Sequence, residues 1–473
     1  MVRHAGLLAT LPAAGALVAR TPSLDAANDL PRAKDCLPAD EDMHIVFSTG
    51  CNAYQHWQAE VLLNSAWHQG QCGNVTRIVV GCEKKVVERI RAHPGGAADE
   101  LIAEGDLKKS TFPGLKVHVA PAIAEAEEFA WFNKPWSFKH WLDSQSDAIA
   151  ERAVVILDPD EFFLQPLTQR AEHADDSPFE IINGYPEQLK HQVTDVAQPG
   201  WGVAQKYGFG PEILRKFDQR TICPSGAASP CANMTSEEAK QYYPAGPPYI
   251  LHNTDFKKVM PTWLELMKPV YEQDRGDVQA DMYAYVYAAA HHGVRHVALE
   301  NYMVSNVEGL GEAWRWVDSL ASMSCHDPER ALAGRKRPGF IHAAGRYRAC
   351  TGGHRVGHGA EGCPHGSELW DFHKSHVPST ILGCDDPLLA PPPDELFNAQ
   401  AAARNSHGKR SAFMICHLTF MVNRAALDYK AKFCASGFNA NKCTRLVLGP
   451  NQRPALGNPF GYPLARVDQE CNK

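Results

Sequence analysis

The sequence predicts an α/β protein built on a mixed, mostly parallel sheet with helices on both faces. From residue 43 onward, short apolar runs alternate with amphipathic stretches, a pattern typical of parallel strands joined by crossover helices. The composition, with 44% hydrophobic and 21% charged residues over 473 positions, is that of a folded chain. The net charge of −7 comes without a basic block, so the sequence does not support a nucleic-acid surface.

Apolar runs predict four strands in the first third of the chain, at residues 44–48, 76–80, 116–119 and 153–157. The helices expected between them lie at residues 54–69, 83–92 and 134–143. In the first of these helices, apolar residues recur with helical spacing from Trp57 to Ala66 and form one face.

The second half is mixed, with helices predicted at 255–271, 277–291 and 411–433 and strands at 294–303 and 339–343. Residues 385–394 contain three consecutive prolines and are interpreted as a linker that leaves the core. We therefore expect three parts: an N-terminal segment (1–42), a main domain (43–384), and a linker with a helical, cysteine-containing C-terminal extension (385–473).

Fourteen cysteines are spread along the chain without any Cys-x-x-Cys pair. An even, dispersed set favours disulfides and an oxidising compartment over a zinc knuckle. Two N-glycosylation sequons, at Asn74 and Asn233, point to the same compartment.

The N-terminal segment also indicates the secretory pathway. Arg3 and His4 precede an apolar run over residues 5–19, which has the length of a signal-peptide core and is short for a membrane span. We expect either a cleaved signal peptide or an uncleaved anchor of a type II enzyme in the Golgi or endoplasmic reticulum. The alternative is a frayed alanine-rich tail of a cytosolic protein.

The sharpest motif is Asp158-Pro159-Asp160, which directly follows the apolar strand at 153–157. In open α/β sheets, ligands bind beyond the carboxyl ends of the strands. Two carboxylates at such a place suit a hard divalent cation that bridges a diphosphate. The alternative is an acidic turn whose side chains are only solvated.

The stretch at 133–142, followed by the strand and Asp158-Pro159-Asp160, resembles the family of hydroxyproline O-arabinosyltransferases and peptidyl serine α-galactosyltransferases, secretory-pathway enzymes of plants and protists. The resemblance covers about residues 43–434 through an ordered series of short stretches. These stretches are 44–58, 133–142, 205–208, 246–250, 281–285, 303–306, 340–342, 377–378, 384–389 and 412–416.

The resemblance implies a GT-A-like nucleotide-sugar domain, similar to a Rossmann fold, and a retaining, UDP-sugar-dependent glycosyltransferase. The donor would be UDP-arabinofuranose or UDP-galactose, and the acceptor hydroxyproline or serine in secretory glycoproteins. By similarity, Asp158 and Asp160 would hold Mn²⁺ or Mg²⁺ with His342 as the third ligand. The alternative for His342 is a half-buried histidine at a strand end.

Five further residues are candidates for the donor site. Thr49, at the end of the first strand, would reach the ribose. Lys374, like Arg346 and Arg348, would add positive charge near the phosphates, where a bound cation stabilises the leaving UDP. Asp281, on a predicted amphipathic helix, is the acidic residue expected near the sugar and the candidate catalytic group.

Two other functions stay open at this point. Cys350 and Cys363 enclose a segment rich in glycine and histidine, and residues 350–365 together could bind zinc and support a hydrolase. A Cys350–Cys363 disulfide is the favoured interpretation of that segment. The other alternative is a catalytically inactive, glycan-binding member of the same fold.

Overall fold

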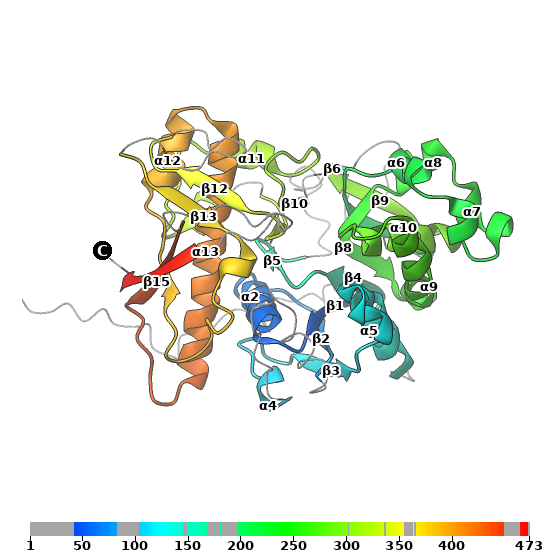
Figure 1. Cartoon of the computed structure of the whole chain (residues 1–473), viewed down its shortest axis with the longest axis horizontal. Helices are drawn as coiled ribbons and strands as arrows, with labels where there is room; N and C mark the ends of the chain where they lie inside the picture. Colours follow the sequence, from blue (N-terminus) through cyan, green and yellow to red (C-terminus); the bar gives the residue numbers. More distant parts are fainter. Residues whose placement is uncertain are drawn as a thin grey trace, which may run out of the picture.

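The computed structural model describes residues 42–82, 104–144, 149–167, 180–181, 197–300, 302–334, 337–353, 363, 366–448 and 464–471. Within these residues the largest sheet has eight strands in the order β3-β2-β1-β4-β8-β7-β9-β6 (Figure 1). Its strands are β1 (Met43–Gly50), β2 (Asn74–Val80), β3 (Lys116–Ala120), β4 (Ala153–Leu157), β6 (Glu180–Ile181), β7 (Trp201–Lys206), β8 (Ala245–His252) and β9 (Arg295–Glu300).

The sheet is parallel in its first half and mixed in its second. Strands β3, β2, β1 and β4 are joined by parallel pairings. Strand β8 is antiparallel to both β4 and β7, the pairing of β7 with β9 is parallel, and β6 is antiparallel to β9. The prediction of a mixed α/β sheet is therefore confirmed.

Helices cover both faces of the sheet because its strands are apolar on both sides. Alternate residues of β4 point to opposite faces: Val155 lies in the core under α2 (Ala53–His68) and α13 (Ser406–Phe433). Its neighbour Val154 lies in a second core under α5 (Asn133–Ser144), α9 (Asn253–Gln273) and α10 (Ala280–His291). Figure 1 shows α13 and the α9–α10 pair on opposite sides of the molecule.

Shorter elements complete the fold. Small sheets are formed by β10 (Met303–Val304), β11 (Phe340–His342) and β5 (Glu161–Phe163), by β12 (Tyr347–Cys350) and β13 (Leu369–Phe372), and by β14 (Leu388–Leu389), β15 (Lys442–Leu448) and β16 (Leu464–Glu470). Short α-helices are α4 (Glu104–Leu107), α6 (Pro211–Lys216), α7 (Gln219–Ile222), α8 (Ser236–Tyr242), α11 (Trp314–Asp318) and α12 (Glu395–Ala402). The 3-10 helices are η2 (Ala124–Glu127), η3 (Ala130–Phe132), η6 (Gly226–Ala228), η7 (Pro230–Asn233), η8 (Pro328–Leu332) and η9 (Lys374–His376).

Most predicted elements are present with shifts of a few residues at their ends. The predicted strand at 294–303 is divided into β9 and β10. The helix predicted at 83–92 and residues 1–41 of the N-terminal segment lie outside the described residues. The linker interpretation of 385–394 is wrong: Leu388, Leu389 and Ala390 are buried in the same core as β1 and α2. Because α13 also contributes to this core, the C-terminal extension packs on the main domain.

Six disulfides join described cysteines, and no described cysteine is free. The predicted Cys350–Cys363 bond is confirmed. The other pairs are Cys51–Cys82, Cys223–Cys231, Cys325–Cys416, Cys384–Cys434 and Cys443–Cys471. Such a disulfide content is that of a protein from an oxidising compartment. Among the described residues, no helix combines the length and apolar character that a membrane span needs.

The two sequon asparagines use their side-chain amides within the fold. Asn74 lies in β2 and donates to the Glu151 carboxylate. Asn233 donates to the carbonyls of Ala227 and Ser229 at 2.8 and 3.1 Å. Both amides therefore have structural partners in the folded chain.

Candidate functional site

The turn after β4 lies at the place where an open α/β sheet binds its ligands. The chain runs outward from β1 through β2 to β3 and then returns to β4 on the other side of β1. Ligands bind in the crevice beyond the carboxyl ends of strands at such a reversal. Asp158 and Asp160 follow the last residue of β4, and Glu161 begins β5. The Asp158 amide donates to the Glu161 carboxylate at 2.9 Å, which closes the turn.

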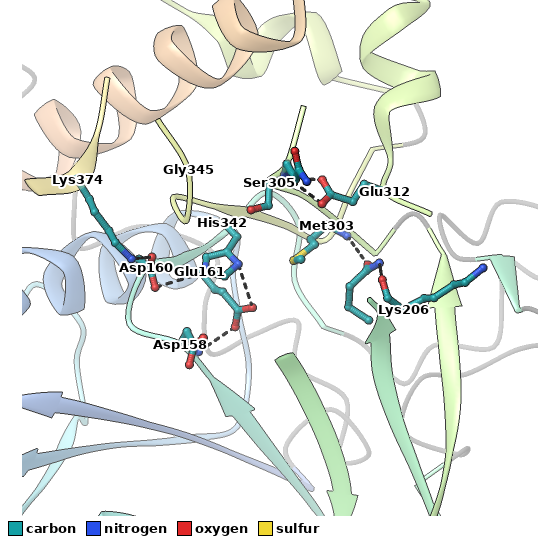
Figure 2. Close-up of polar contacts among 12 residues, drawn as sticks. Asp158, Asp160, Glu161, Lys206, Met303, Ser305, Glu312, His342, Gly345 and Lys374 are labelled. Atoms are coloured by element: carbon teal, nitrogen blue, oxygen red, sulfur yellow. Dashed lines mark hydrogen bonds and ion pairs between the residues drawn. The ribbon is translucent and has the colours of Figure 1, made fainter. Parts of the chain in front are cut away.

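The pairing of β5 with β11 brings His342 to this turn. The two strands are antiparallel, and His342 is the register partner of Glu161. One candidate ligand atom from each of Asp158, Asp160 and His342 lies within 4.8 Å of the others. Figure 2 shows the three side chains converging from the turn after β4 and from β11. The trio singled out in the sequence is therefore brought together in space.

The trio fits a divalent cation by its chemistry as well as its spacing. Two carboxylates and one imidazole are a donor set suited to Mn²⁺. Asp160 and His342 are 4% and 7% exposed, and the buried Nδ1 of His342 has no hydrogen-bond partner among the described residues. The Tyr347 hydroxyl donates to the His342 carbonyl at 3.1 Å and so fixes the backbone that carries the imidazole.

Two lysines pair with the aspartates of the turn. Lys374, at the start of η9, lies 2.5 Å from Asp160. Figure 2 shows the Lys374 side chain pointing toward this aspartate. Lys134, in the first turn of α5, lies 2.6 Å from Asp158 and 2.9 Å from Asp281 of α10. The predicted residues Lys374 and Asp281 are thus part of the same group. We call Asp158, Asp160, His342, Lys374, Lys134 and Asp281 the carboxylate cluster.

Opposite charges set the protonation of this cluster. Burial alone would raise the pKa of Asp160, but Lys374 and His342 hold it well below its usual range. Burial alone would lower the pKa of His342, but the Asp160 carboxylate raises it to about 9. For Lys134, the Asp158 and Asp281 carboxylates outweigh burial and raise the pKa above its ordinary value. Burial raises the pKa of Asp281 against the opposing charge of Lys134.

Thr49 belongs to a second buried group of polar side chains, and its expected contact with the ribose stays a prediction. It lies at the carboxyl end of β1, but its hydroxyl accepts a 3.0 Å hydrogen bond from Nε of Arg77. Arg77 also donates to Nδ1 of His56 at 2.8 Å, and burial keeps that imidazole neutral by lowering its pKa to about 3. Glu60 lies nearby, buried, and accepts from the amide of Thr111 at 2.7 Å. We call Thr49, His56, Glu60 and Arg77 the Arg77 cluster; it holds α2 against β2.

Sequence reasoning missed the roles of Lys134, Glu161 and Glu312. Lys134 belongs to the 133–142 stretch, and it is buried in the helix α5 that this stretch forms. A lysine in a helix that packs on the sheet was the sequence signal that could have indicated a role for this residue. Glu312 accepts from the amides of Ser305 and Asn306 at 2.5 and 3.1 Å and closes the loop beside His342 in Figure 2. Burial raises the pKa of Glu312 to about 7. Glu161 directly follows Asp158-Pro159-Asp160 and Glu312 ends a glycine-containing loop, but nothing in the sequence indicated the contacts that these two carboxyls make.

Arg346 and Arg348 both bind Asp371 of β13, at 2.7 and 3.3 Å, on the hairpin that leads to Lys374.

The zinc-hydrolase alternative loses two of its ligands because Cys350 and Cys363 form a disulfide. The three histidines of that segment, at positions 354, 358 and 365, lie outside the described residues.

The fold and this cluster define a mixed α/β protein with a candidate cation site at the carboxyl edge of its sheet. Residues 43–243 match the family model of the hydroxyproline O-arabinosyltransferase family N-terminal domain, which confirms the family resemblance found in the sequence. The match ends before His342 and Lys374, so these two residues lie beyond the matched domain.

Individual relatives agree with this family. The chain is 23% identical over 265 residues to hydroxyproline O-arabinosyltransferase RDN2 of Medicago truncatula, covering 55% of this chain and 59% of that protein. It is 25% identical to the arabinosyltransferase PLENTY of Lotus japonicus, covering 56% and 63%. Peptidyl serine α-galactosyltransferase of Arabidopsis thaliana is 29% identical over 27% of this chain and 14% of its own length. The chain thus spans less than two thirds of these relatives.

Among solved structures, the apo form of the bifunctional glycosyltransferase WbbM aligns with 66% of this chain and 47% of its own length. The TM-score of that alignment is 0.30 and the sequence identity is 15%.

Proposed function

We propose that this protein is a retaining glycosyltransferase with a GT-A-like domain that uses a UDP-sugar, UDP-arabinofuranose or UDP-galactose, as donor. Its acceptor is hydroxyproline or serine in a secretory protein, and its site is in the lumen of the Golgi or endoplasmic reticulum. The observation that carries the proposal is the convergence of Asp158, Asp160 and His342 at the carboxyl edge of the sheet, in a chain whose residues 43–243 match the arabinosyltransferase domain.

In this proposal Asp158, Asp160 and His342 hold Mn²⁺ or Mg²⁺. The cation supplies positive charge for the diphosphate that leaves when the sugar–phosphate bond breaks. Lys374, whose ammonium already lies within this group, adds charge on the same side. Asp281 presents a buried carboxylate near the sugar and is oriented by Lys134, which also contacts Asp158.

The test is UDP release by the purified protein. A panel of UDP-sugars is offered with hydroxyproline-rich and serine-rich peptides, in Mn²⁺ or in chelator. We expect peptide-dependent UDP release that requires Mn²⁺ and falls by about 10³-fold or more in Asp160→Asn, because removal of one preorganised charge at a developing anion has effects of this order.

The matched control is Asp143→Asn. Asp143 lies in α5 and is exposed, and within the described part of the chain its ion pair is with Lys139, four residues earlier. The same chemical change there therefore leaves turnover unchanged. Turnover that is insensitive to chelator and to Asp160→Asn would contradict the metal site. Turnover without a peptide would contradict the protein acceptor.

A further inference from the structure

Both aspartates of the turn after β4 are already bound to ammonium groups. Lys134 reaches Oδ1 of Asp158 from α5, and Lys374 reaches Oδ2 of Asp160 from η9. Lys134 and Asp160 are both buried, at 8% and 4% exposure. Charges this deeply buried persist only beside compensating charge. The lysines therefore neutralise the aspartates in the protein without ligands.

A divalent cation at this place competes with the lysines for the same carboxylates. If the cation entered alone, the ammonium groups would give up their partners and two positive charges would remain in a site largely closed to water. Breaking a buried ion pair by removing one partner is strongly unfavourable. A diphosphate that enters with the cation removes this penalty, because its oxygens accept the lysines that the aspartates release.

The two lysines differ in how freely they can change partner. Asp281 gives Lys134 a second carboxylate at 2.9 Å, so this lysine keeps one partner when Asp158 turns to the cation. Lys374 has a more exposed side chain than Lys134, 23% against 9%. Lys374 is consequently the lysine better able to move from its aspartate to an incoming anion.

We infer that Lys134 and Lys374 are internal counter-ions that make the divalent cation and the nucleotide diphosphate bind as a coupled pair. The inference rests on the proposed function, since it takes UDP as the anion. Coupling of this kind is reciprocal: UDP raises the affinity for the cation by the same factor by which the cation raises the affinity for UDP. Lys374 is the positioning residue that carries most of the coupling.

The experiment is calorimetric titration of the full chain with Mn²⁺ and with UDP, each alone and each at saturation of the other, corrected for Mn²⁺ binding to UDP in buffer. For the wild type we expect a coupling factor of about tenfold or more, within the range usual for linked sites. In Lys374→Met, Mn²⁺ alone binds about tenfold more tightly than to the wild type, because Asp160 no longer has to be released, and the coupling factor falls toward one.

The matched control is Lys139→Met, the same substitution in the same helix as Lys134 but at an exposed pair, and it keeps the wild-type coupling. A second variant combines Lys134→Met with Asp281→Asn. It removes one charge of each sign, so position 281 does not carry a buried carboxylate without a partner. We expect its coupling factor to lie between those of the wild type and Lys374→Met.

The outcomes separate this inference from the proposed function. UDP binding with equal Mn²⁺ affinity in its presence and absence overturns the counter-ion inference and leaves the transferase proposal standing. Absence of UDP binding under every condition overturns both. If both lysine variants keep the wild-type coupling factor, or if both weaken Mn²⁺ binding in the absence of UDP, the role of the lysines is overturned.

Discussion

Two of the buried charged clusters in the described part of the chain, the carboxylate cluster and the Arg77 cluster, are bonded in opposite ways. In the carboxylate cluster, lysine ammonium groups lie 2.5–2.9 Å from aspartate oxygens. In the Arg77 cluster, the guanidinium donates to the neutral side chains of Thr49 and His56, and Glu60 accepts from Thr111. The first cluster joins elements from α5 to η9, whereas the second joins β1, α2 and β2.

This difference separates a site that can exchange charge from one that cannot. A lysine–aspartate ion pair can separate when a cation and an anion arrive together, because each side chain then finds a new partner of opposite charge. The carboxylate cluster is therefore suited to binding such a pair of ligands. The hydrogen bonds of Arg77 offer no such exchange, because their acceptors, Thr49 and His56, are neutral groups that a cation and an anion would not replace. Its hydrogen bonds serve to hold α2 on the sheet.

The largest expected contrast compares two buried histidines, one from each cluster. His342→Ala removes a proposed ligand, and we expect the Mn²⁺ affinity at saturating UDP to fall by more than about 100-fold. This exceeds the loss in metal affinity that usually follows when a residue hydrogen-bonded to a ligand is removed. His56→Ala leaves Arg77 without one acceptor and costs stability while leaving Mn²⁺ binding unchanged. Calorimetry and urea unfolding measure the two effects. Equal Mn²⁺ affinities for the two variants would remove the distinction between the clusters.

A smaller effect is expected from Glu60 and depends on pH. Burial raises the pKa of this carboxyl from its ordinary value of 4.5 to about 7, against the hydrogen bonds from Thr111. The folded state therefore keeps a proton that the unfolded state loses, and the contribution of Glu60 to stability falls as pH rises from about 4.5 through 7.

Glu60→Gln removes this titration and keeps an acceptor for Thr111. We expect the variant to gain about 2 kcal/mol of unfolding free energy relative to wild type between pH 5 and pH 8. Urea unfolding at the two pH values measures the gain. A difference between variant and wild type that does not change with pH would show that Glu60 titrates normally.

The smallest expected effect on ligand binding is that of a change at Thr49. Thr49→Val keeps the shape but leaves Nε of Arg77 without its acceptor, which costs about 1–3 kcal/mol of stability. We expect the affinity for UDP to stay within about twofold of wild type. A loss of UDP affinity with stability intact would instead support the expectation that Thr49 contacts the ribose.

The sequence was most informative where local patterns and the family resemblance agreed. Apolar runs located β1, β2, β3 and β4, and the strand before Asp158 located the turn. Neither source gave the pairing of β5 with β11, because strand register between distant segments depends on tertiary packing. The convergence of His342 on the turn was expected from the resemblance alone, and its role as a ligand stays a prediction.

Other features were beyond the sequence for physical reasons. Lys134 looked like an ordinary helix residue, since nothing local indicates that Asp158 and Asp281 meet there. The prolines at 391–393 suggested a linker, yet the neighbouring residues Leu388 and Leu389 pair with β15 as a strand and are buried. Proline restricts the backbone but does not by itself expose a segment.

The pairing of β5 with β11 has a consequence for synthesis on the ribosome. Asp158 and Asp160 leave the exit tunnel long before His342 and Lys374, which are translated about 180 to 210 residues later, at rates of roughly 5–20 residues per second. During that interval the nascent chain carries both aspartates with only Lys134 available as their counter-ion. Asp158, Asp160 and His342 come together only when β11 docks, so an incomplete polypeptide lacks the residue proposed as the third ligand.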